Sequence, residues 1–157
     1  MGVARRSNEL NQDNAFYQSL QFILSMISKA IQFVVPLANK PGTMSKLCSA
    51  LGKEGVNIIA ILVPEAEVRQ KARLLVKTDD LAKARRILKR AKIRFSEEEV
   101  LDIEMDNRPG AFGELAGKLA RAKINIKYAN ATTAPFARAR VVMAVADVAK
   151  ALAVLDK

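Results

Sequence analysis

The stretch DNRPGAFGELAGKLARAKINI, residues 106 to 126, repeats the earlier stretch ANKPGTMSKLCSALGKEGVNI, residues 38 to 58. Seven positions are identical between the two stretches, and the members of each pair stand 68 residues apart. The pairs are Asn39 with Asn107, Pro41 with Pro109, Gly42 with Gly110, Leu47 with Leu115, Leu51 with Leu119, Asn57 with Asn125, and Ile58 with Ile126. Because one offset holds across a turn, a helix face and the start of a strand, the chain contains an internal repeat.

Each copy of the repeat predicts the same order of elements: strand, helix, strand, strand, helix. The predicted strands are residues 32–39, 56–63 and 72–78 in the first copy and residues 100–107, 124–130 and 139–145 in the second. The first helix of each copy carries one apolar stripe, formed by Met44, Leu47, Cys48 and Leu51 or by Phe112, Leu115, Ala116 and Leu119. Farther along, the matching residues Asp80 and Asp147 stand 67 residues apart, not 68. The second copy has therefore lost one residue in the hairpin between its second and third strands, where a loop tolerates a change of length.

A fourth strand at residues 92–99 completes the first copy as a βαββαβ unit, which is the ferredoxin-like order. The second copy stops at Lys157, where its fourth strand would begin, so it apparently lacks that strand. The sequence therefore predicts an α+β fold of two tandem ferredoxin-like units. We expect an N-terminal extension at residues 1–30, the first unit at residues 31–98 and the second at residues 99–157.

The absent strand would leave residues 100–105 without a neighbour on one side of the sheet. Either the segment 19–31 or another chain could cover this edge. The apolar residues of that segment fit both helical and strand spacing, and we favour a helix. Pro36 also lies inside a predicted strand, where it cannot donate a ladder hydrogen bond, which argues for an edge or a bulge there.

The composition argues against several classes of function. The chain has no histidine, which removes the commonest general base and the usual zinc ligand, so we expect no enzyme activity, no cofactor and no metal. The single cysteine, Cys48, cannot form an internal disulfide and fits a packed thiol in the reducing cytoplasm. No apolar run is long enough to span a bilayer, so we expect no membrane association.

The net charge of +10 is concentrated in the run KARRILKRAKIR, residues 83–94, which has seven cations and no acid. Such a run is typical of a solvated helix face, and it can also attract nucleic acid or an acidic protein. A basic interaction module without a small ligand is therefore the alternative function. We do not expect nucleic acid as the partner, because the chain has neither interleaved aromatic stacking residues nor a known nucleic-acid motif.

The repeated turn N-x-P-G has the chemistry of a small-ligand site. Proline fixes one backbone angle, glycine leaves the approach open, and the helix that follows presents unpaired amides that attract a carboxylate. The side-chain carbonyl of Asn39 or Asn107 can accept a bond from an ammonium group, and Asn57 and Asn125 could reach the same neighbourhood. Together these groups describe a receptor for an α-amino acid. Taken alone, the motif is equally that of a turn that only joins strand to helix.

The two repeated stretches resemble the ACT domain, a regulatory module that commonly binds amino acids, and the resemblance covers residues 31–157. It implies that ligands bind between ACT units, where the turn of one unit faces the second strand of its neighbour. In the first copy it implicates Asn39, Lys40, Pro41, Gly42, Thr43, Asn57 and Ile58. In the second copy it implicates Asp106, Asn107, Arg108, Pro109, Gly110, Ala111, Asn125 and Ile126. Tyr128, Thr132 and Thr133 could line the same pocket.

The two copies differ where the first has Ala38 and the second has Asp106, and we favour the second turn because Asp106 can pair with an ammonium group. The sequence thus predicts a non-catalytic, cytoplasmic regulatory protein that binds an amino acid at ACT–ACT interfaces. We expect it to form a homodimer and to signal to a partner enzyme or regulator on a separate chain.

Overall fold

The computed structural model describes residues 27–64, 69–133 and 138–156, so most of the predicted N-terminal extension lies outside the described residues. The first half of the described chain contains β1 (Ile27–Ala38), α2 (Thr43–Gly52), β2 (Ile58–Leu62), β3 (Arg69–Val76), a short 3-10 turn η1 (Thr78–Asp80) and α3 (Leu81–Arg90). The second half contains β4 (Ser96–Met105), α4 (Ala111–Arg121), β5 (Ile126–Thr132), β6 (Ala139–Val145) and α5 (Val148–Leu155).

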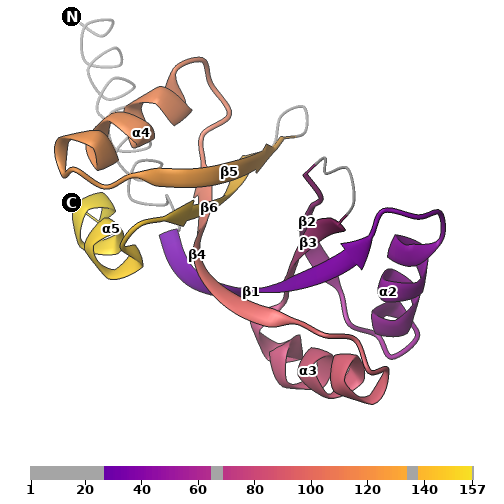
Figure 1. Ribbon diagram of the computed structural model, residues 1–157. Helices are drawn as coiled ribbons and strands as arrows, with labels where there is room; N and C mark the ends of the chain where they lie inside the picture. The colour runs from indigo at the N-terminus through magenta and orange to yellow at the C-terminus, as the bar shows by residue number, and fades with distance from the viewer. Residues whose placement is uncertain (1–26, 65–68, 134–137, 157) are drawn as a thin grey trace, which may run out of the picture.

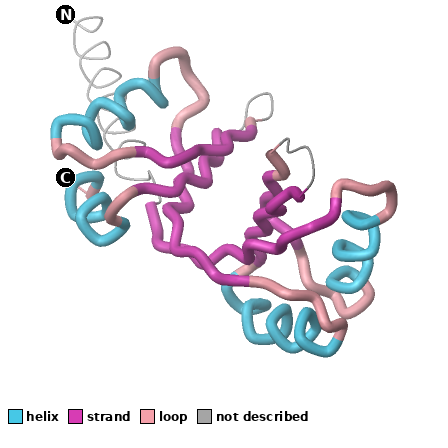
Figure 2. Tube along the Cα trace, in the orientation of Figure 1, coloured by secondary structure: helices cyan, strands magenta, loops and turns pink. Residues whose placement is uncertain are grey.

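The strands form one six-stranded antiparallel sheet in the order β2-β3-β1-β4-β6-β5. β1 and β4 run through both halves as long curved strands, with α2 and α3 beside one half and α4 and α5 beside the other (Figure 1). Figure 2 shows the strands as a single curved layer with the helices on its outer side. Each half has the ferredoxin-like strand order, which confirms the predicted α+β fold of two tandem units.

β1 supplies the strand that the second unit lacks. Its first residues, 27–31, pair with residues 99–103 of β4, and Ile27 packs against the core of the second unit. The predicted cover by the segment 19–31 is therefore confirmed for residues 27–31, whereas the helix favoured for those residues is wrong. Pairing with β4 satisfies the backbone of both strands, and this tertiary contact decides a local pattern that fitted either structure. Residues 19–26 lie outside the described part of the chain.

The two long strands do not start and end together. β4 begins at Ser96 opposite Val34, while β1 continues beside β3 as far as Ala38. Pro36 therefore has a paired strand on one side only, which confirms the predicted edge position. The predicted fourth strand at residues 92–99 starts four residues too early, because α3 ends in a turn in which Lys92 has a φ of 54° and the Ile93 N–H bonds the Leu88 carbonyl.

Each helix pair covers its own apolar core, and both predicted stripes contribute to these cores. Leu47 and Leu51 of α2 are buried in the first core, and Leu115 and Leu119 of α4 are buried in the second. The predicted position of Phe112 in the stripe is wrong, because this side chain is 41% exposed. The buried row of α4 begins instead at Ala111, four residues before Leu115, which is one helical turn.

Candidate ligand-binding turns

The two repeated turns have the same backbone conformation. Gly42 has φ 83° and ψ −14°, and Gly110 has φ 83° and ψ −16°. This left-handed conformation is open to glycine and strained for other residues, which explains why both copies have glycine there. A Cβ atom at either position would meet no atom within 4 Å, so the space in front of each turn is open.

The helix N-termini behind both turns keep free donors. The Thr43 N–H bonds the Lys40 carbonyl and the Ala111 N–H bonds the Arg108 carbonyl, each at 3.3 Å. Neither glycine offers a side chain to cap its helix. Within the described chain, the amides of residues 44, 45, 112 and 113 donate to no backbone carbonyl. These amides and the positive end of the helix dipole are suited to a carboxylate.

The second turn offers the better position for an ammonium group. The Arg108 guanidinium donates to both oxygens of Glu114, at 2.8 and 2.5 Å, and this pairing lowers the pKa of Glu114 and raises the pKa of Arg108. Asp106 is half-buried beside this pair. Glu114 is the main partner of Arg108, and the charge of Asp106 adds to it in raising the pKa of Arg108, so Asp106 places a second negative group at this turn.

The asparagines of the second strands lie far from the turn of their own unit. Gly110 and Asn125 stand at opposite ends of α4, whose 11 residues correspond to about 16 Å at 1.5 Å per residue. Gly42 and Asn57 are separated in the same way by α2. A turn and an asparagine can therefore meet only when they come from different units.

The second strands are placed for such a meeting, because β2 and β5 are the two outer strands of the sheet. Inside the chain they approach each other near their C-terminal ends, where the Asn130 side chain donates to the Ile61 carbonyl at 3.2 Å. Asn57 and Asn125 directly precede β2 and β5, so they lie at the ends of these strands opposite to this contact, and both are exposed. Residues Ile58 and Ile126 pack partly on their own cores.

Several solved structures share this arrangement. The protein BT0572 of Bacteroides thetaiotaomicron matches 83% of this chain and 88% of its own with 27% identity and a TM-score of 0.73. The ligand-free regulatory subunit of aspartate kinase from Thermus thermophilus matches 83% of this chain and 93% of its own with 19% identity and a TM-score of 0.62. The chain adopts the tandem ACT fold.

Larger proteins also contain a region of this shape. Aspartokinase III of E. coli, solved in complex with lysine and aspartate, matches 83% of this chain over 30% of its own length, with 14% identity and a TM-score of 0.51. No protein-family model and no curated protein sequence matches the chain. The ACT assignment therefore rests on the repeat, the sheet topology and the similar solved structures together.

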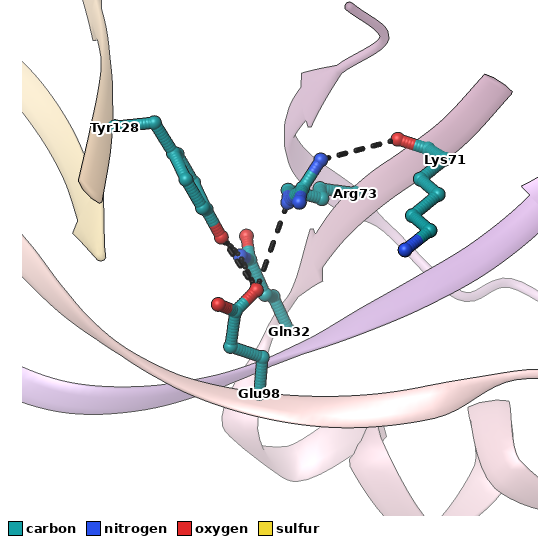
Figure 3. A network of polar contacts seen from close by, with 5 residues as sticks. All are labelled: Gln32, Lys71, Arg73, Glu98 and Tyr128. Carbon is teal, nitrogen blue, oxygen red and sulfur yellow. Dashed lines mark hydrogen bonds and ion pairs between the residues drawn. The ribbon is translucent and has the colours of Figure 1, made fainter. Parts of the chain in front are cut away.

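A polar network joins the two ACT units on the inner face of the sheet (Figure 3). The Tyr128 hydroxyl of the second unit donates to Glu98 at 2.6 Å, and Gln32 donates to the same carboxylate at 3.2 Å and also contacts the Tyr128 hydroxyl. Arg73 lies 3.6 Å from Glu98, with its guanidinium 4.5 Å from the centre of the Tyr128 ring. Gln32 is only 2% exposed.

This network changes the role expected of Tyr128. Burial, followed by the hydrogen bond to Glu98, raises the pKa of Tyr128 to about 12, so its hydroxyl stays a donor at neutral pH. Its ring lies over the inner face and its hydroxyl is engaged with the first unit, which makes Tyr128 part of the contact between units. No motif marks Gln32, Arg73 and Glu98 in the sequence. A polar Gln32 within an apolar strand is the signal that indicates a buried polar contact there.

The basic run on α3 is partly neutralised within its own ACT unit. Arg85 donates to both oxygens of Glu97, at 2.6 and 2.8 Å, which lowers the pKa of Glu97 and raises the pKa of Arg85. Arg90 forms an ion pair with Glu54. Two of the seven cations that the alternative function requires are thus occupied by acids of the same unit.

Across residues 27–64, 69–133 and 138–156, no group of three histidine, cysteine or acidic residues is placed to hold a metal ion. In the same part of the chain, no helix is both long and apolar enough to cross a bilayer. Cys48 is half-buried in α2, and burial raises the pKa of its thiol.

Proposed function

We propose that the chain is a non-catalytic regulatory protein that binds an amino acid between ACT units. The observation that carries this proposal is the identical open turn of the two units, with a left-handed glycine, free amides at a helix N-terminus and clear space in front. In the second unit Asp106 adds an acceptor for the ammonium group. The carboxylate would bind the amides of residues 112 and 113, and Asn107 would help to orient the ligand.

The binding site is completed by a second copy of the chain. Because each helix separates its turn from the asparagine of the same unit, we propose that the second strand comes from another copy of the chain. Pairing the outer edge of β5 with the same edge of another copy would run the two strands antiparallel and bring the start of one strand towards the turn of the other unit. We therefore propose a homodimer in which Asn125 and Ile126 of one protomer face Asp106–Ala111 of its partner.

Regulation would follow from linkage between the ligand and the arrangement of units. A ligand that bridges two units stabilises the arrangement in which both parts of the site meet, and a partner enzyme that distinguishes the two arrangements responds to the ligand. Similar folds support this role, since they occur in a regulatory subunit of aspartate kinase and in an aspartokinase solved with lysine and aspartate. We place this function in the cytoplasm, because the single cysteine cannot form an internal disulfide.

The first test is thermal unfolding of the full chain against each common amino acid. A ligand present at a hundredfold excess over its dissociation constant adds about 2.7 kcal/mol to the free energy of unfolding, which raises the midpoint measurably. We expect one or a few amino acids to do so. If no amino acid raises the midpoint at millimolar concentration, the proposed function is wrong.

The site is tested by Asp106→Asn, which keeps the shape of the side chain and removes its charge. We expect this variant to keep its unliganded midpoint and to lose about tenfold in affinity for the amino acid. Asp79→Asn, at an exposed position in η1, is the matched control and keeps full affinity. Gly110→Val is a second variant that narrows the approach to the amides. If Asp106→Asn and the control bind the amino acid with equal affinity, the ligand does not bind at the second turn.

A further inference from the structure

A groove of about 550 Å³ lies beside the first unit, between the end of β1 and the connection from α3 to β4. It exists because β1 extends to Ala38 while β4 begins only at Ser96, opposite Val34. The left-handed backbone of Lys92 turns the connection at the end of α3, before β4 begins. The groove is lined by residues 36–38 of β1, by Lys40 of the turn and by residues 92–94.

The charge of this groove has a single sign. Lys40, Lys92 and Arg94 line it, all three are exposed, and no acidic residue lines it. None of the three makes an ion pair with another described residue. Two acids of the same unit are paired elsewhere, because Glu97 is bound by Arg85 and Glu54 by Arg90. Three unpaired cations around one groove repel each other and favour an anion among them.

The floor of the groove is apolar. Leu37 is buried, and Ile93 packs partly against the first core. These two side chains form the floor, and they carry no acceptor that could pair with the cations. A volume of this size is in the range of small-molecule sites. A ligand with a short carbon skeleton and several anionic groups matches this combination of floor and rim.

We propose that this groove binds a small polyanion, a molecule with two or more carboxylate or phosphate groups. A ligand with one anionic group would leave two of the three cations unneutralised, whereas a ligand with two or three such groups would neutralise most or all of them. The planar guanidinium of Arg94 can hold one such group with two parallel hydrogen bonds, and the two lysines supply point charges. The groove lies on the first unit and shares no residue with the amino-acid site proposed for the second turn, so either site can fail alone.

The test is calorimetric titration of the full chain with citrate and with inorganic pyrophosphate at fixed ionic strength. We expect binding of at least one probe, weakened about tenfold or more in the variant Lys40→Gln/Lys92→Gln/Arg94→Gln. Tighter binding of citrate would assign carboxylates, and tighter binding of pyrophosphate would assign phosphate esters. Arg94→Glu alone is a second variant and should weaken the binding of both probes, because it places a carboxylate on the rim of the groove.

The control variant is Lys53→Gln/Lys77→Gln/Lys150→Gln, which removes the same charge from exposed positions outside the groove. It should bind the probes as the unmodified chain does. An equal loss in this control would mean that the net charge of +10 attracts anions without a site, and the proposal would fail. Absence of binding at millimolar citrate and pyrophosphate would overturn it as well. The proposal would also be overturned if a short DNA duplex bound more tightly than either probe and if its binding required the three groove cations. That result would assign the groove to nucleic acid.

Discussion

Replacing Tyr128 with phenylalanine tests whether the polar network holds the two ACT units together. The change removes one hydroxyl and leaves the ring in place. Glu98 then loses its 2.6 Å donor but keeps Gln32 and the nearby Arg73. A hydrogen bond to a charged group contributes about 1.5–3 kcal/mol, and the lower end applies because the network is partly exposed to water. We therefore expect the free energy of unfolding to fall by about 1.5 kcal/mol.

The assay is urea denaturation at neutral pH, with Glu98→Gln and the double variant completing a mutant cycle. If the hydroxyl and the carboxylate act together, the loss in the double variant is smaller than the sum of the two single losses. Additive losses, or a loss below about 0.3 kcal/mol in Tyr128→Phe, would refute the network as a contact that stabilises the fold.

The same substitution has a pH dependence with a definite sign. The pKa of Tyr128 is raised to about 12 in the folded chain, from about 10 in an unfolded one. The stabilisation by its neutral hydroxyl is therefore complete below about pH 10 and is lost as the pH rises towards 12. The difference in stability between the unmodified chain and Tyr128→Phe should shrink across this window. A difference that stays constant between pH 9 and pH 11.5 would contradict the assigned role of the hydroxyl.

Three further predictions concern other parts of the fold. Lys123, two residues after the end of α4, has a φ of 57°, and the matching residue of the first copy is Gly55, with a φ of 72°. In thermal unfolding, Lys123→Gly should therefore stabilise the chain by about 1 kcal/mol, and Gly55→Ala should destabilise it similarly. Because Arg85 lowers the pKa of Glu97, the pair stabilises the fold at neutral pH, and this contribution is lost as the pH falls through the lowered pKa. In acid titrations of both chains, the stability difference between the unmodified chain and Glu97→Gln should therefore shrink as the pH falls below the ordinary carboxyl range. Leu101 is fully buried on the strand that both units share, so Leu101→Ala should cost about 3 kcal/mol and lower one common transition, and two separate transitions by circular dichroism would contradict a single cooperative sheet.

The internal repeat allowed most of the fold to be predicted. The turns, the first helices and the strand order follow from a pattern that occurs twice, so each copy supports the interpretation of the other. For the first residues of β1 the predicted helix is wrong, because their spacing fits helix and strand equally and only pairing with β4 decides between them. The sequence predicts the start of β4 too early, because no glycine marks the left-handed position that Lys92 occupies after α3.

The candidate site was predictable in part. Local chemistry identified Gly42 and Gly110, whose backbone requires glycine for a reason visible in the sequence. It did not show that a helix separates each turn from the asparagine of its own unit, because this separation depends on the direction of the strands. The inner network of Gln32, Arg73, Glu98 and Tyr128 comes from four different strands, and such residues meet only in the folded sheet.

Hydrogen exchange with and without the amino acid that raises the unfolding midpoint would test the central claim most directly. The account predicts slower exchange in two separate segments, the amides that follow Gly110 at the start of α4 and the residues around Asn125 at the start of β5, because the ligand joins the turn of one protomer to the second strand of its partner. Slower exchange in only one of these two segments would contradict a ligand site between ACT units. Slower exchange in another part of the chain, with both segments unchanged, would contradict it as well.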